Sequence, residues 1–169
     1  QMEIIFDGFD RKDYAAVDKD TQFLLDNYRK RPIPSSDLYK IARLYKNAGL
    51  ADKAVNIHAI NAAGSQSVES MWSQVELVYA SLEQKDDKQA DTAGKELCER
   101  FNKTPGISRQ LYSVACKFGS LARGDKSREY HRYNVQQQGS AFESMWSQVE
   151  IVKACFAAKD IAQDRKSVV

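Results

Sequence analysis

Few residues of this chain have the types and spacing that chemistry at a site requires. The two histidines, His58 and His131, are isolated in the sequence, at positions that we do not expect to be equivalent. Neither belongs to an HExxH motif or to a cluster of cysteines and histidines, so we expect packed or solvated imidazoles instead of metal ligands. No glycine-rich phosphate loop and no GxSxG nucleophile elbow occurs. The sequence therefore predicts no enzymatic activity and no cofactor.

The cysteines and the composition indicate the setting of the chain. An odd count of three cysteines, Cys98, Cys116 and Cys155, without CxxC spacing indicates free thiols, so we expect an intracellular protein of the cytoplasm or an organelle matrix. Cys116 and Cys155 lie among apolar residues, and we expect both to be buried and inert. A formal net charge of +2 is too small to predict a nucleic-acid partner. No run of about 18 apolar residues occurs, so we expect no membrane span.

The strongest pattern in the chain is an internal repeat. The octet ESMWSQVE occurs at 69–76 and again at 143–150, at an offset of 74. A tandem duplication explains this repetition, and an offset of this length fits two helical hairpins in each module. Lys85-Asp86 and Lys159-Asp160 continue the correspondence downstream.

A third, more diverged copy lies at the start of the chain, at an offset of 73. Gln1–Phe6 aligns with Gln74–Tyr79. Further aligned pairs are Lys12-Asp13 with Lys85-Asp86, Leu24 with Leu97, Tyr28 with Phe101, Pro32 with Pro105 and Leu38-Tyr39 with Leu111-Tyr112. We therefore expect a single repeat array with modules at approximately 1–73, 74–147 and 148–169, the last one partial. Because Gln1 falls inside the helix of the repeated octet, we expect the chain to be part of a longer array.

Apolar residues recur at helical spacing along the chain, and no segment shows the sustained alternation of a half-buried strand. The helical stripes span 38–48, 54–60, 68–82, 90–101, 111–121 and 130–135, and a last one begins at Phe142. Ile4, Leu77 and Ile151 are apolar but lie off these stripes, which predicts helices that pack against two neighbours, as in a stacked array. The expected fold is all-α, a right-handed α-solenoid of about four and a half antiparallel hairpins.

Trp72 and Trp146 lie on the apolar stripe of the repeated helix. We expect both indoles to pack in the core instead of stacking on a ligand. Glu76 and Glu150 follow one turn later, where a carboxylate can accept the indole N–H. This motif is therefore interpreted as structural.

The segment 35–67 resembles a tetratricopeptide repeat. The matching positions are large, large, small and aromatic in the first helix and small in the second, namely Leu38, Ile41, Ala42, Tyr45 and Ala54. His58 and Asn61 depart from the aromatic residue and the alanine that the family has at its next two positions. The resemblance implies a protein–protein interaction scaffold that binds a peptide or a partner helix in a concave groove.

In such arrays the first helix of each hairpin lines the groove. Carried over position by position, the resemblance gives the groove residues Tyr39, Arg43, Lys46, Asn47, Ser73, Gln74, Tyr112, Lys117, Ser147 and Gln148. Arg43, Lys46 and Asn47 would suit a carboxylate or an acidic peptide, through charge-assisted hydrogen bonds. The expected partner is therefore a protein or a peptide with acidic character.

The same hairpin is also similar to a pentatricopeptide repeat, a family that binds single-stranded RNA. The match rests on equally spaced pairs of glycines, Gly49 with Gly64 and Gly124 with Gly139. Pro105 fits the proline that often ends such units. Ser73 and Ser147 would take the base-reading position, and Tyr39 and Tyr112 would take it in the other hairpins. Arg29-Lys30-Arg31 forms a short basic cluster, which is also typical of a helix end.

A structural subunit of a large assembly is the third possible role. An array without capping repeats exposes apolar faces at its ends, so we expect the chain to self-associate.

Overall fold

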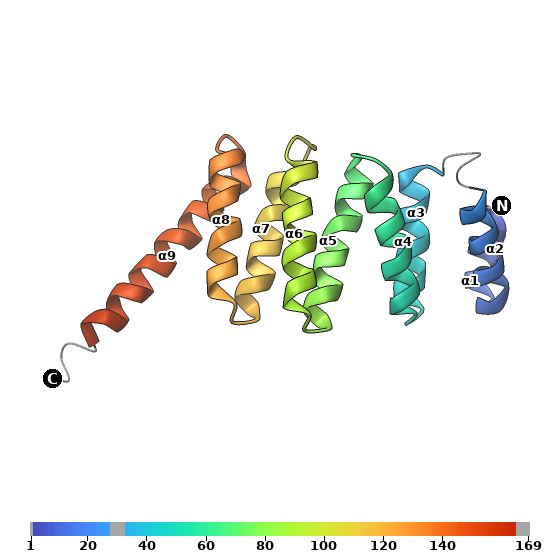
Figure 1. The fold of residues 1–169 in the computed structure, drawn as a ribbon, viewed down its shortest axis with the longest axis horizontal. Coiled ribbons are helices and arrows are strands. Elements are labelled where there is room, and N and C mark those ends of the chain that lie inside the picture. The colour runs from blue at the N-terminus through green and yellow to red at the C-terminus, as the bar shows by residue number, and fades with distance from the viewer. Residues whose placement is uncertain (1, 28–32, 165–169) are drawn as a thin grey trace. The chain divides into compact units, whose positions relative to one another are not determined.

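The structure is a computed structural model that describes residues 2–27 and 33–164, with side chains up to Ala158. Within these residues the chain forms nine α-helices and no strand (Figure 1), which confirms the all-helical prediction. The predicted pairs of Tyr28 with Phe101 and Pro32 with Pro105, and the basic cluster Arg29-Lys30-Arg31, involve positions outside the described residues.

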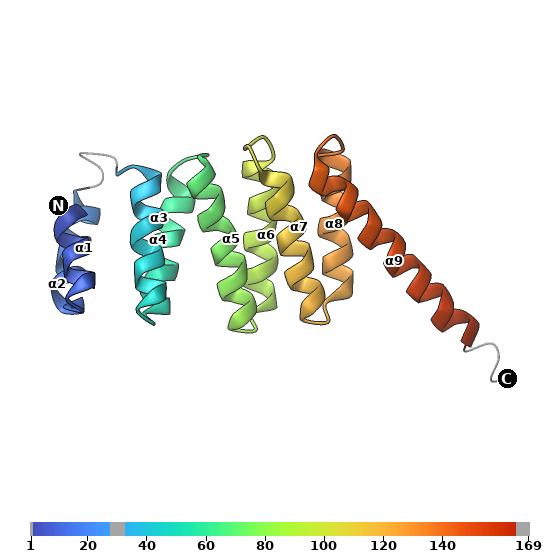
Figure 2. The same cartoon turned by 180° about the vertical axis from the view of Figure 1, so that it is seen from behind.

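The helices pack in consecutive adjacent pairs, such as α3 with α4 and α7 with α8, and the same pairs lie side by side in Figure 2. Their bounds are α1 (Met2–Asp10), α2 (Tyr14–Asp26), α3 (Ser35–Asn47), α4 (Ala51–Gly64), α5 (Val68–Glu83), α6 (Asp87–Phe101), α7 (Ile107–Ser120), α8 (Gly124–Gln137) and α9 (Phe142–Asp164). This order matches a helical repeat of four and a half hairpins. One difference is that α9 continues through Lys159-Asp160, where the repeat predicts a turn.

The chain forms two compact units, Gln1–Leu77 and Val78–Val169. The first unit contains α1 to α4 and the beginning of α5, and the second contains the end of α5 and the remaining helices.

The turn before α2 and the turn before α6 have the same backbone conformation. Lys12 and Lys85 adopt left-handed φ angles of 59° and 60°. The aspartate that follows each lysine caps the next helix, Asp13 by accepting from Ala16 N at 3.2 Å and Asp86 by accepting from Gln89 N at 2.9 Å. The alignment of the first, diverged copy is therefore confirmed in the backbone.

The five positions that carry the repeat resemblance are all buried, with exposures of 3% or less. The prediction that the apolar residues off the main stripes pack against a second helix holds only in part. Leu77 and Ile151 are half-buried, whereas Ile4 is 58% exposed because no described residue covers that side of α1.

The same ion pair joins successive hairpins in both units. In the first unit Lys53 of α4 pairs with Asp18 of α2. In the second unit Lys126 of α8 pairs with Asp91 of α6, with 2.5 Å between Nζ and Oδ1. Both partners are shifted by the repeat offset of 73, so the repeat preserves contacts between hairpins as well as the hairpins themselves.

Candidate functional site

Arg43 and Asn47, two of the predicted groove residues, line an open hollow of about 330 Å³ in the first unit. Lys40 and Leu44 also line it from α3, and Phe6 contributes from α1. The four α3 residues have the spacing i, i+3, i+4 and i+7, which places them on one side of the helix. The hollow therefore combines two cations and an amide with two apolar side chains.

Lys46 and Tyr39, two further predicted groove residues of α3, contact residues of neighbouring helices. Lys46 Nζ donates to Glu76 of α5 at 2.6 Å and remains half exposed. The Tyr39 ring lies 5.6 Å from the His58 ring and 5.4 Å from Trp72, between ring centroids. Partial burial, followed by the charge of Glu76, raises the pKa of Tyr39. Both residues thus help to join α3 to its neighbours.

Ser73, Gln74 and Ser147 are buried, so the prediction that they line the groove is wrong. Their exposures are 0%, 1% and 0%. The two serines are buried because each is small and polar and lies against a second helix. Ser73 faces α4 and Ser147 faces α8, where each side chain is hydrogen-bonded to an asparagine.

A buried polar cluster, here termed the His–Asn–Ser cluster, forms between α4 and α5. Asn61 Nδ2 donates to Ser73 Oγ at 2.8 Å, and His58 Nδ1 lies 3.0 Å from the same oxygen. Ser35 Oγ donates to Asn61 Oδ1 at 2.7 Å, which adds the start of α3. A single asparagine therefore bridges three helices, as a side chain with both a donor and an acceptor can do.

The second unit contains the same cluster between α8 and α9. Asn134 Nδ2 donates to Ser147 Oγ at 2.9 Å, and His131 Nδ1 lies 3.1 Å from that oxygen. Ser108 Oγ donates to Asn134 Oδ1 at 2.8 Å. The Tyr112 ring lies 5.6 Å from the His131 ring, the same separation as between Tyr39 and His58.

The two histidines therefore occupy equivalent positions, contrary to the prediction from the sequence. The spacing from Tyr39 to His58 and Asn61 equals the spacing from Tyr112 to His131 and Asn134. That pattern could have revealed the equivalence. It was hidden because the loops around the two copies differ in length, so the offset shifts from 73 at these residues to 74 at the octet.

Burial disfavours the protonated form of both imidazoles. Burial lowers the pKa of His58 to about 4, with Glu76 opposing the shift and Lys46 adding to it. Burial also lowers the pKa of His131, opposed by Glu150. His58 Nε2 has no hydrogen-bond partner among the described residues. With the serine hydroxyls fully buried, the arrangement joins helices and does not present a nucleophile to a substrate.

The two tryptophans differ in burial. Trp72 is half-buried, whereas Trp146 is 51% exposed, so the prediction of core packing is wrong for Trp146. The Trp146 ring contacts Tyr112 edge-on at 5.8 Å and Phe142 at 5.7 Å, but no described residue covers its outer side. Glu76 and Glu150, proposed as acceptors for the indoles, form ion pairs with Lys46 and Lys153.

The cations of the first unit are not repeated in the second. Cys116, Gly119 and Ser120 stand where the first unit has Arg43, Lys46 and Asn47. Among the other predicted groove residues of this unit, Lys117 Nζ lies 5.9 Å from the Tyr79 ring centroid and Gln148 is exposed. The set Arg43, Lys46 and Asn47 is therefore specific to α3 and is not repeated in α7.

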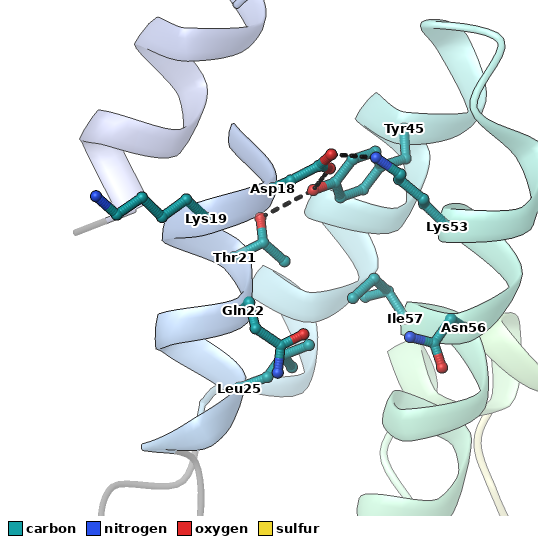
Figure 3. Close-up of a pocket in the computed structure, with 9 residues that line it drawn as sticks. All are labelled: Asp18, Lys19, Thr21, Gln22, Leu25, Tyr45, Lys53, Asn56 and Ile57. Atoms are coloured by element: carbon teal, nitrogen blue, oxygen red, sulfur yellow. Dashed lines mark hydrogen bonds and ion pairs between the residues drawn. The ribbon is translucent and has the colours of Figure 1, made fainter. Parts of the chain in front are cut away.

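A second hollow, of about 400 Å³, lies between α2, α3 and α4 (Figure 3). Tyr45 Oη donates at 3.0 Å to Asp18 Oδ1 and approaches Thr21 Oγ1 at 3.2 Å, while Lys53 pairs with Asp18. Burial raises the pKa of Tyr45 to about 12, so its hydroxyl stays protonated. These polar groups satisfy one another, which indicates a contact between hairpins more than a ligand site.

The three cysteines differ in burial, and all are free thiols. Cys98 is buried, and burial raises its pKa to about 12. Cys116 and Cys155 are exposed, so the prediction that both are buried is wrong. Among the described residues no three His, Cys, Asp or Glu side chains gather as metal ligands would. None of the described helices combines the length and apolar character needed to cross a bilayer.

Comparison with known proteins gives no relative: no family model, no curated protein and no solved structure matches this chain.

Proposed function

We propose that this chain is a tetratricopeptide-like, right-handed helical-repeat scaffold that binds an acidic peptide segment in the hollow on α1 and α3. The observation that carries the proposal is the joint lining of this hollow by Arg43, Asn47 and Lys40 beside Phe6 and Leu44. Three of these residues offer hydrogen-bond donors, and Arg43 and Lys40 also offer positive charge. Among the described residues no carboxylate lines the hollow, so its lining favours an anion.

The chemistry of the hollow matches a peptide with carboxylates next to an apolar side chain. Guanidinium and ammonium groups form charge-assisted hydrogen bonds with carboxylates, and these are about twice as strong as neutral ones. Phe6 and Leu44 can receive one apolar side chain of the peptide.

Binding of single-stranded RNA is the alternative, and the structure removes one of its supports. Ser73 and Ser147, assigned to the base-reading position, are buried and hydrogen-bonded within the His–Asn–Ser clusters. Bases cannot reach them without opening the contact between hairpins. Tyr39 and Tyr112 are partly buried against histidine and tryptophan.

The proposal is tested by fluorescence anisotropy with a short labelled peptide in which glutamate and leucine alternate. Arg43→Glu replaces an attraction by a repulsion and is expected to weaken binding about tenfold or more, with unchanged helicity and melting. Lys88→Glu is the matched control, because Lys88 is an exposed lysine of α6, in the other unit. A peptide with glutamine for glutamate should bind weakly to all variants.

Equal binding by the wild type and Arg43→Glu would show that the hollow is not the site. A parallel titration with mixed single-stranded RNA at two salt concentrations separates the alternative. RNA binding that falls steeply with salt, without binding of the acidic peptide, would replace the scaffold proposal by RNA recognition.

A further inference from the structure

Helix α9 exposes an apolar face in the second unit. The exposed side chains follow one another at spacings of three and four residues, namely Phe142 (60%), Met145 (54%), Val149 (51%), Val152 (43%) and Phe156 (64%). Trp146, at 51%, lies beside them. This spacing forms a continuous stripe along several turns, which is the pattern of a helix that packs against another helix. The other side of α9 contacts α7 and α8.

The same face is buried in the first copy of this helix. Helix α5 carries the same octet, and its equivalent residues are Met71 (0%), Val75 (4%), Val78 (0%) and Leu82 (3%). The exposed stripe on α9 is therefore equivalent to a face that is buried in α5. An exposed stripe without a buried copy elsewhere in the chain would not indicate what kind of element packs against it.

The second unit also shows the kind of helix that follows the covered copy. After the turn at Lys85 and Asp86, α6 returns beside the end of α5 (Figure 1). Its buried residues are small in the first turns and large and apolar later, namely Ala90 and Ala93 and then Leu97 and Phe101, whereas Gly94, also buried, faces Tyr130 of α8. Small residues let two helix axes approach closely, and the later large residues fill the widening space.

Helix α9 instead continues past the position of that turn, and its far end extends beyond α8 (Figure 2). Large apolar patches on a surface mark interaction sites. From these observations we propose that the exposed face of α9 is a docking site for one amphipathic helix of a protein partner, with small residues in its first two turns and large apolar residues in its third and fourth. This site is separate from the hollow of the first unit and does not depend on the function proposed for it.

The experiment uses the whole chain and a labelled peptide of residues 86–102, the α6 segment, with Cys98→Ser to prevent disulfides. We expect saturable binding below about 1 mM peptide. In a Trp72→Phe background, Trp146 is the only tryptophan, and its emission should shift to shorter wavelength as the peptide covers it. A peptide with Leu97→Asp should not bind.

Two variants of α9 locate the site. Val149→Asp places a charge in the stripe and should weaken peptide binding at least about tenfold. Gln148→Asp is the matched control, because Gln148 is exposed on the same helix but lies off the stripe, and binding should not change. Circular dichroism checks that both variants remain folded, which the exposure of both positions favours.

Three outcomes would overturn the inference: no binding up to about 1 mM peptide, equal binding by wild type and Val149→Asp, or binding without a change in Trp146 emission. Sedimentation of the wild type distinguishes another occupant. A dimer that Val149→Asp dissociates and that the peptide does not displace would assign the face to a second copy of the chain.

Discussion

The two units fill one equivalent position of their cores with opposite arrangements of side chains. In the first unit the tyrosine comes from α3, where Tyr45 reaches across to Thr21 of α2, and its hydroxyl lies 3.2 Å from Thr21 Oγ1. Ile57 of α4 completes the group, and all three residues line the hollow of Figure 3.

At the equivalent position of the second unit, the tyrosine comes from the other helix of the hairpin. Phe118 of α7 replaces Tyr45, and Tyr130 of α8 replaces Ile57, with the two rings stacked at 5.2 Å. Gly94 of α6 replaces Thr21, and a Cβ at Gly94 would lie 1.8 Å from Tyr130 Oη. The larger Tyr130 on α8 is accommodated because Gly94 on α6 has no side chain. The comparison teaches that packed volume at this position is maintained while the residues change.

The largest expected effect comes from replacing Gly94 by threonine, the residue at the equivalent position of the first unit. Gly94→Thr should lower the free energy of unfolding by about 1–3 kcal/mol, because the new side chain overlaps Tyr130. Tyr130→Ile alone should cost about 2 kcal/mol or more, because it leaves a cavity beside Gly94. Since each change compensates the other, the double variant should be about 1 kcal/mol more stable than the sum of the two single-variant losses predicts.

Urea denaturation of the four proteins in this cycle measures the coupling. Gly124→Ala is the control for an added methyl group, because its Cβ would meet its nearest neighbour, Arg128, at an ordinary 3.4 Å. Additive effects of Gly94→Thr and Tyr130→Ile would contradict the compensation between the two units.

The His–Asn–Ser clusters show the opposite behaviour, because their residues are the same in both units and only the rim differs. Lys46 and Glu76 pair across helices at the edge of the first cluster. At the second, Glu150 pairs with Lys153 of its own helix. The buried contacts between hairpins are thus retained where the exposed charges have changed, which separates a structural role for the clusters from a binding role for the rim.

The next largest effect should come from the asparagines that bridge each cluster. Asn61→Ala and Asn134→Ala each remove one hydrogen bond to a buried serine that also contacts a histidine, so each should cost about 1–3 kcal/mol. Equal losses in urea denaturation would support equivalent clusters. Asn56→Ala, at an exposed position of α4, serves as the control and should change stability by less than about 0.5 kcal/mol. A loss at only one of the two asparagines would show that the clusters differ in role.

Much of the fold could be predicted from the sequence because its signals are local or repeated. The apolar period predicted the helices, and the alignment of Lys12-Asp13 with Lys85-Asp86 corresponds to the same left-handed turn and cap in both copies. These features depend on residues close in sequence, so no knowledge of the neighbouring helices was needed.

The candidate site was predicted less well because it depends on which helix each face meets. Ser73 and Ser147 lie on polar sides of their helices, and only the position of the preceding helix makes those sides buried. Arg43 and Asn47, predicted to line a groove, are exposed and line the hollow, but Phe6, which completes the hollow, comes from a different hairpin. No helical period within α3 indicates that contact.

The comparison also predicts a dependence of stability on pH through the two histidines. Burial lowers the pKa of His58 to about 4 and lowers that of His131, so in both cases the folded state disfavours the proton. The unfolded imidazole binds a proton near pH 6.5. Stability is therefore present above about pH 6.5 and falls as the pH is lowered towards the folded pKa, by up to about 1.4 kcal/mol per pH unit for each histidine.

Urea denaturation at pH values between about 7 and 5 isolates this effect, because unperturbed carboxylates titrate mainly below that range. His58→Gln should reduce the slope, since glutamine carries no proton to exchange. His131→Gln should do the same in the second unit, where burial again acts against Glu150. If the unfolding free energies of the wild type and both variants have the same slope against pH, the imidazoles bind protons equally in the folded and unfolded states. The buried hydroxyl and amide groups of the clusters would then have to stabilise a charged imidazole.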